Sequence, residues 1–170
     1  MSIDSLKQRV QQQFGDKAEA YALSRVHAHA PSLARLVELV QPQADWVALD
    51  VATGPGHTAH AFAPHVQRVV ASDLTPQMLP KARSLAVGRG LTNLDAVAAD
   101  AENLPFPRAA FNLVTCRIAP HHFPDVAGFV RECARVTRSG GTVAIVDQLT
   151  PGDPKAARYI NAFERLRDPS

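Results

Sequence analysis

Five short apolar runs alternate with helix-like segments along most of this chain. The runs are WVALDV (46–51), VQRVVASD (66–73), LDAVAAD (94–100), FNLVTCR (111–117) and GGTVAIV (140–146). Helical patterns at 57–64, 76–88 and 124–138 follow or separate them. Short apolar strands separated by helices are typical of a parallel sheet with helices on both faces. The sequence therefore predicts an α/β fold.

The composition describes an ordinary globular domain. The chain has 170 residues, of which 46% are hydrophobic and 20% charged, and its formal net charge is +2. That length fits one domain, and that charge is too small to predict a nucleic-acid partner. Cys116 and Cys133 lie in apolar segments without a CxxC motif, which favours reduced thiols. With no signal-peptide core and no membrane-spanning run, we expect a cytoplasmic protein.

Two helical stretches precede the first apolar run. Residues 3–14 carry apolar side chains at helical spacing, and residues 16–29 contain Tyr21, Ser24 and His27. Pro31 then suits the first turn of a helix that reaches Val40. We expect residues 1–30 to form a helical lid, residues 31–150 the sheet domain, and residues 151–170 the start of a C-terminal segment.

Three of the apolar runs end in an acid: Asp50, Asp73 and Asp100. Right-handed crossovers bring the carboxyl ends of parallel strands to one edge, where ligands of such sheets bind. Each acid has an alternative structural role; Asp73 or Thr75, for instance, could cap the helix that Pro76 opens. Thr75 is the better cap, which leaves Asp73 for a ligand. Together the acids predict a site for a ligand with an amine, a ribose and an adenine.

A glycine turn follows the first strand, with the sequence Val51-Ala52-Thr53-Gly54-Pro55-Gly56-His57. Glycines let the backbone approach a ligand closely, although a tight strand-to-helix turn without a ligand explains them equally well. A dinucleotide fingerprint requires G-x-G-x-x-G, and those positions hold Ala52, Gly54 and His57. The register therefore argues against a nicotinamide oxidoreductase.

In this order and spacing, LDVATGPGH, VVASDLTPQML, AADAENLPFP and FNLVTCRIAPHHFPD resemble class I S-adenosylmethionine-dependent methyltransferases. The closest likeness is to the ubiquinone- and menaquinone-biosynthesis type, over about residues 16–150. The resemblance implies a Rossmann-like fold, S-adenosyl-L-methionine as cofactor, and a small-molecule methyl acceptor, such as a quinone precursor, methylated on carbon or oxygen.

The resemblance also implies residue roles. Asp50 and the loop of Ala52, Thr53, Gly54 and Gly56 would hold the methionine end of the cofactor. Asp73 would bind the ribose hydroxyls, Leu74 would pack on the adenine, and Asp100 with the Ala101 N–H would bind the adenine edge. Arg117 and Ile118 would lie beside the methionine moiety and the substrate. Tyr21, with Ser24 and His27, would come from the lid.

Two departures from the family are visible. Ala52 and Thr53 replace the usual glycine and the usual cysteine or serine, a pair that quinone-type members also carry. The family fold has seven strands, whereas this chain accounts for five, so strands six and seven are expected to be missing. A truncated binding module without turnover is therefore an alternative function. An unpaired apolar edge on the fifth strand (142–146) would then favour a homodimer or aggregation.

Methyl transfer needs alignment more than acid–base groups, but a carbon or phenol acceptor is helped by a base. His121 and His122 follow the fourth strand and are the candidate catalytic residues. The alternative is that one packs under the loop and the other faces water. His57 and His60 lack partners for a metal site, so no metal is expected and a solvated helix face is predicted for them.

Overall fold

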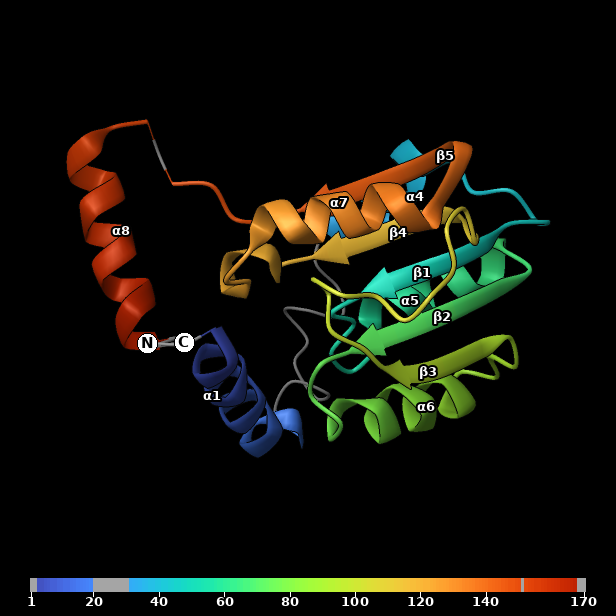
Figure 1. Ribbon diagram of the computed structural model, residues 1–170, viewed down its shortest axis with the longest axis horizontal. Coiled ribbons are helices and arrows are strands. Elements are labelled where there is room, and N and C mark those ends of the chain that lie inside the picture. The colour runs from blue at the N-terminus through green and yellow to red at the C-terminus, as the bar shows by residue number, and fades with distance from the viewer. Residues whose placement is uncertain (1–2, 20–30, 151, 168–170) are drawn as a thin grey trace.

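A computed structural model describes residues 3–19, 31–150 and 152–167. It contains a five-stranded sheet in the order β3-β2-β1-β4-β5 (Figure 1). Every neighbouring pair runs parallel, which confirms the predicted α/β, Rossmann-like sheet. The strands are β1 (Val47–Val51), β2 (Arg68–Asp73), β3 (Leu94–Ala98), β4 (Phe111–Arg117) and β5 (Thr137–Val146).

The order of the strands reverses at β1, which lies between β2 and β4. In an open parallel sheet, the crevice beyond the carboxyl ends of the strands at such a switch point is where ligands bind. All the carboxyl ends lie at one edge, and helix α1 (Ile3–Asp16) lies beyond them (Figure 1). The fold thus places the N-terminal helix next to the predicted site.

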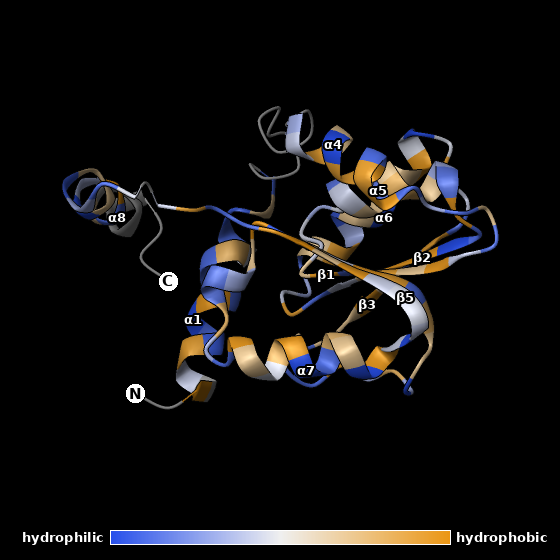
Figure 2. Ribbon diagram, turned by 90° about the horizontal axis from the view of Figure 1, so that it is seen from above, coloured by the Kyte–Doolittle hydropathy of each residue, from blue (hydrophilic) through white to orange (hydrophobic). Residues whose placement is uncertain are grey.

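Helices cover the two faces of the sheet unequally. Figure 2 shows α4 (Pro31–Val40), α5 (His57–Phe62) and α6 (Met78–Gly88) on one side and α7 (Val126–Val136) on the other. The short 3-10 helices η1 (Ala63–His65) and η2 (Pro120–His122) follow α5 and β4. Helix α8 (Pro154–Arg167) stands apart from the sheet in both views.

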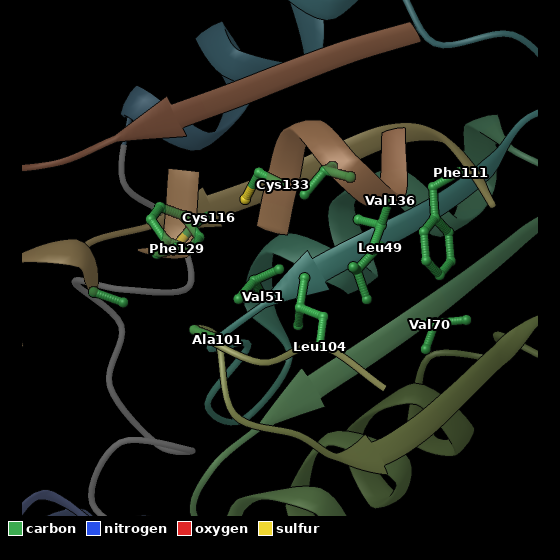
Figure 3. Close-up of a cluster of buried hydrophobic side chains, with 12 residues drawn as sticks. Leu49, Val51, Val70, Ala101, Leu104, Phe111, Cys116, Phe129, Cys133 and Val136 are labelled. Carbon is green, nitrogen blue, oxygen red and sulfur yellow. The ribbon is translucent and has the colours of Figure 1, made fainter. Parts of the chain in front are cut away.

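The core on the α7 side is built from alternate strand residues and one face of that helix. Leu49 projects from the central strand β1, and Phe129, Cys133 and Val136 come from α7 (Figure 3); Val114 of β4 belongs to the same cluster. Phe129 is fully buried, and its ring meets that of Phe123 edge-on, with ring centroids 4.8 Å apart. This cluster fixes α7 against the sheet and supports the loop that follows β4.

The boundary between α7 and β5 differs from the prediction. The helix ends at Val136 rather than at residue 138, and β5 begins at once with Thr137. The register of β4 with β5 shifts between Phe111 and Leu113, and Gly140 takes a φ of 74°. The residues read as a helix stop are therefore an irregular strand start, because a bulge with a left-handed glycine lets them pair.

Among the described residues, β5 pairs only with β4, as expected for an edge strand. Val143 and Ile145 on this strand are 40% and 44% exposed, so the predicted apolar edge is present. The histidine prediction was wrong: His57 and His60 are buried, because α5 packs against the sheet and α4, and His60 Nε2 lies 2.8 Å from the carbonyl of Ala82 on α6. None of the described helices is long and apolar enough to span a membrane.

Replacing Phe129 with Ala should lower the free energy of unfolding by about 3–5 kcal/mol, because it opens a cavity in a fully packed cluster. Urea unfolding at equilibrium measures the change. Val130→Ala is the matched control: this neighbour on α7 is 49% exposed and should change stability by no more than about 0.5 kcal/mol. Equal losses in the two variants would contradict the assigned core.

Candidate functional site

A cavity opens beyond the carboxyl ends of the strands and holds about 1220 Å³, including the space open to solvent at its mouth. Segments that follow β1, β2, β3 and β4 line it, and α1 closes one side with Lys7, Val10 and Phe14. Most of the predicted residues meet there: Ala52, Thr53, Gly54, Asp73, Leu74, Asp100, Ala101, Arg117, Ile118, His121 and His122. Tyr21, Ser24 and His27 lie outside the described residues.

Asp50 does not line this cavity, although the sequence predicts it there. Its Oδ2 accepts hydrogen bonds from the Thr53 hydroxyl at 2.6 Å and the Ala59 N–H at 3.1 Å. Its Oδ1 accepts from the Thr115 hydroxyl at 2.7 Å. Both carboxylate oxygens are thus hydrogen-bonded inside the protein, and from the end of β1 the carboxylate caps the first turn of α5. Two of the three predicted acids, Asp73 and Asp100, face the cavity.

The glycine turn is shaped by its neighbours. Gly54 takes a φ of 55°, and its N–H donates to Asp73 Oδ2 at 2.7 Å. Gly56 takes a φ of 90°, and a Cβ there would lie 2.8 Å from the His60 ring. Gly56 is absent from the cavity lining, so it serves the close packing of α5, whereas Gly54 presents its backbone to the cavity.

Asp73 helps to hold this turn as well as lining the cavity. Its Oδ1 accepts from the Thr75 N–H at 2.8 Å, and the Thr75 hydroxyl also bonds the carboxylate. The prediction that Thr75 caps the next helix was wrong: α6 begins at Met78, and its N-cap, Gln77, makes no side-chain cap bond. Burial raises the pKa of Asp73 and these hydrogen bonds oppose the rise. A carboxylate has about four acceptor positions, and these hydrogen bonds with that from Gly54 use three of them, so room remains for a ligand hydroxyl.

Two residues without the freedom of glycine adopt left-handed backbone at the cavity wall. Ala52 has a φ of 52° directly after β1, and Ile118 has a φ of 54° directly after β4. A β-branched residue in this region is strained, and such strain is concentrated at functional sites. At Ala52 it occurs where the resembled family usually has glycine.

Sequence reasoning missed Lys7, which reaches from α1 to the end of β3. Its Nζ lies 2.6 Å from both Asp100 Oδ2 and Glu102 Oε2. Burial lowers the pKa of Lys7, but the hydrogen bonds and charges of the two carboxylates outweigh it, so the pKa is raised overall. The helical spacing of Lys7 with Val10 and Phe14 is the one sequence signal that could have placed it on the cavity side.

Arg117 brings a positive charge to the other side of the glycine turn. Its Nε donates to the Thr58 hydroxyl at 3.1 Å, and its side chain lines the cavity at the end of β4. Burial lowers the pKa of Arg117, while the nearby Asp50 carboxylate opposes that shift. A guanidinium keeps its charge under such conditions, so this part of the cavity suits a carboxylate group.

The two histidines of η2 have different surroundings. His121 Nδ1 lies 2.7 Å from Asp147 Oδ1, and its backbone N–H donates to Asp147 Oδ2 at 3.0 Å. The His122 ring packs edge-on against Phe14 from α1, with centroids 5.0 Å apart, and lies 3.9 Å from the His121 ring. Asp147 was not predicted, although it too is an acid directly after an apolar run.

The cavity therefore combines carboxylates, one of them paired with a lysine, at one end with a guanidinium and imidazoles at the other. Asp73 can accept from a diol, and Asp100 from an amine. Leu74 and Met78 offer apolar surface to a flat ring. These groups fit an adenosine that carries an amino-acid chain. In the part of the chain that the structure describes, they offer no cluster of donors suited to a pyrophosphate at the turn, where Asp73 already accepts from the Gly54 N–H.

Comparison with known proteins decides between an adenosine with an amino-acid chain and a pyrophosphate as the ligand class. A sequence family described as a methyltransferase domain matches residues 49–145, more than half of the chain. The chain belongs to the S-adenosylmethionine-dependent methyltransferases. The cofactor of this family is S-adenosylmethionine, which the acceptors of the cavity fit. The glycine register and the family match together disfavour the nicotinamide alternative.

Three relatives illustrate the likeness. The chain is 40% identical to the uncharacterized methyltransferase YcgJ of Bacillus subtilis over 92% of its own length and 62% of that protein's. The YcgJ crystal structure matches with a TM-score of 0.76 and 41% identity, over 81% of this chain and 59% of YcgJ.

The other two are named for their reactions. The aklanonic acid methyltransferase DauC of a Streptomyces species is 31% identical over 85% of this chain and 67% of DauC. The ubiquinone/menaquinone biosynthesis C-methyltransferase UbiE of Ectopseudomonas mendocina is 31% identical over 68% of this chain and 46% of UbiE. The methyltransferase chain thus spans about three fifths of YcgJ and less than half of UbiE.

Asp50→Asn should change how the stability of this methyltransferase depends on pH. Burial raises the pKa of Asp50 from 3.8 to about 6, against the lowering effect of its hydrogen bonds. Between these values the folded state holds a proton that the unfolded chain releases. The contribution of Asp50 to the free energy of unfolding is therefore highest below about pH 4. It falls as the pH rises through 6, by about 3 kcal/mol in total.

Urea unfolding between about pH 4 and pH 7 measures this contribution as the difference between the two proteins. The Asn variant should lack the fall, because it cannot ionise. Asp95→Asn, at a carboxylate that is 51% exposed, is the control and should keep it. An unchanged pH slope in Asp50→Asn would show that this carboxyl does not titrate as its burial implies.

Lys7→Met should loosen α1. The ammonium bonds two partly buried carboxylates, and charged hydrogen bonds of this kind contribute about 1.5–3 kcal/mol. Amide hydrogen exchange in residues 3–16 should accelerate at least about tenfold, while exchange in β1 stays the same. Lys17→Met, at an exposed lysine beyond α1, should leave the exchange of α1 unchanged. Equal rates in the two variants would remove Lys7 as the anchor.

Proposed function

We propose that this chain binds S-adenosylmethionine beside Gly54 and transfers its methyl group to a small-molecule acceptor. The observation that carries the proposal is the meeting of Asp73, Asp100 and Arg117 around one cavity at the switch point of the sheet. When bound, the cofactor supplies the reactive methyl group as a sulfonium. The protein then has to bind, orient and exclude water.

Each part of the cavity supports one part of that ligand. Asp73 would accept from the ribose diol through its remaining acceptor position, with Leu74 against the adenine. Asp100 would accept from the adenine amine, and the Ala101 N–H would donate to the ring.

The methionine end lies toward the Ala52–Gly54 turn in this arrangement. Arg117 there would pair with the carboxylate, and Ile118 would lie beside the methionine chain. Asp50 would act through Thr53 by holding the turn in place, rather than by touching the ligand.

A small organic acceptor is favoured by the shape and lining of the remaining cavity. Val10 and Phe14 of α1 and Phe123 after η2 give it an apolar wall. DauC is named for aklanonic acid and UbiE for ubiquinone and menaquinone, and each is similar to this chain over two thirds of its length or more. These names support an organic acceptor, with a quinone precursor as one member of the class.

The alternative is a binding module without turnover, since the chain spans about three fifths of YcgJ. Radiolabelled methyl transfer to a panel of quinols and phenols separates the two. Label in an acceptor supports the enzyme, and cofactor binding without label transfer supports the module. Binding of NADH in place of S-adenosylhomocysteine would overturn both.

Asp73→Asn should weaken binding of S-adenosylhomocysteine, measured by calorimetry, about tenfold to a hundredfold, because charged hydrogen bonds to the ribose are lost. Asp73 also holds the Gly54 turn, so a second ligand is needed. The 2′-deoxy analogue lacks one hydroxyl, and the variant should lose less affinity for it than for the parent ligand.

Asp95→Asn is the matched control on the neighbouring strand, and it should bind both ligands as the wild type does. Equal losses for the two ligands in Asp73→Asn would mean that Asp73 shapes the turn but does not touch the ribose. Unchanged affinity for S-adenosylhomocysteine in that variant would remove Asp73 from the site.

A further inference from the structure

We propose that His121 and Asp147 form a general-base pair for a phenol-type hydroxyl acceptor; this rests on the proposed methyl transfer. The pair assembles at the junction of β4 and β5. Arg117, the last residue of β4, pairs with Val146, and the Ile118 N–H continues the ladder to the Val146 carbonyl at 2.7 Å. The left-handed turn at Ile118 then folds η2 back over the end of β5, where Asp147 follows.

Asp147 holds His121 at two points. One carboxylate oxygen lies 2.7 Å from Nδ1, and the other accepts from the His121 backbone N–H at 3.0 Å. Asp147 Oδ1 also accepts from the Gln148 N–H at 2.8 Å, which fixes the carboxylate in turn. An ionised carboxylate can only accept hydrogen bonds, so Nδ1 of a neutral His121 must carry the proton. Nε2 is then the basic atom of the ring.

The two histidines divide the task. The His122 ring packs against Phe14 and His121, so it forms part of an aromatic wall beside the base. A second, smaller hollow between α1 and η2 shares Val10, His121 and His122 with the main cavity. The pair thus stands where the two hollows meet. An aromatic acceptor that enters between α1 and η2 would reach His121 while the nucleoside end stays covered.

The chemistry selects the acceptor. An imidazole can take the proton that a ring hydroxyl loses as its oxygen attacks, whereas an uncharged amine attacks without losing a proton first. In the transfer, the acceptor oxygen uses an electron pair to bond the methyl carbon, and the carbon–sulfur bond breaks with its pair going to sulfur. The hydroxyl proton passes to Nε2 of His121. The His121 side chain is 41% exposed, so the proton can leave to solvent.

Charged and titratable groups surround the pair from each neighbouring element. Asp147 follows β5, and His122 shares η2. Lys7 and Arg9 come from α1, Arg117 ends β4, and Asp100 and Glu102 follow β3. Because several of these groups carry charge, a pH profile of the wild type alone cannot be assigned to His121. The experiment therefore compares variants at one fixed pH as well as across pH.

The test uses the full chain saturated with S-adenosylhomocysteine and 4-nitrophenol as the acceptor probe. The phenolate form absorbs visible light, so the spectrum reports the ionisation of the bound probe without turnover. We expect bound 4-nitrophenol to ionise about one pH unit below the free phenol, a tenfold change in the ratio of phenolate to phenol at fixed pH. His121→Asn and Asp147→Asn should abolish this shift and leave affinity for S-adenosylhomocysteine within about twofold.

His122→Asn should weaken binding of the probe but keep its ionisation shift, and Asp153→Asn, at an exposed acid beyond β5, should change neither. Loss of the shift in His122→Asn and not in His121→Asn would overturn the assignment of the base. Binding of S-adenosylhomocysteine without any ionisation of 4-nitrophenol would overturn this inference and leave the proposed function standing. Failure to bind S-adenosylhomocysteine would instead overturn the proposed function.

Discussion

The buried carboxylate of Asp50 ties together the parts of the sheet edge on which the site depends. It bonds Thr53 in the turn, Ala59 in the first part of α5 and Thr115 on β4. Burying an ionised group is costly unless donors surround it, and here hydrogen bonds reach both oxygens. The pKa of Asp50 is still raised, because these hydrogen bonds offset only part of the cost of burying the charge. A carboxylate at this position thus contributes order at the site at some expense of stability near neutral pH.

The cavity beside the Asp50 hydrogen bonds has two chemically distinct ends. Asp73 and Asp100 stand on the β2 and β3 side, where the backbone of the glycine turn approaches. Arg117 and the imidazoles stand on the β4 and β5 side, against the apolar residues of α1. Because β1 is the switch point, the crossovers leave in opposite directions on either side of it. That divergence separates the carboxylate end, which we propose for the nucleoside, from the imidazole end, which we propose for an aromatic acceptor.

The sheet and the position of the site could be predicted from alternation and from acids at strand ends, since both follow from local patterns. The role of Asp50 could not be predicted, because the pattern does not say whether a strand-end carboxylate faces a ligand or accepts hydrogen bonds from buried hydroxyls such as that of Thr115. Lys7 and Asp147 depend on how distant segments pack, which spacing does not encode. The α7–β5 boundary was missed because Gly140 and Gly141 suit both a helix stop and a bulged strand.

The central position of β1 has a kinetic consequence. Its partner β4 is distant in sequence, whereas β2 and β3 are joined by a single helix. Pairings between distant segments form slowly, because the intervening loop loses entropy before any contact rewards it. Thr115 on β4 and Thr53 after β1 can share the Asp50 carboxylate only once that pairing exists. Competence to bind ligand should therefore appear as one of the last events of refolding, well after most helical structure has formed.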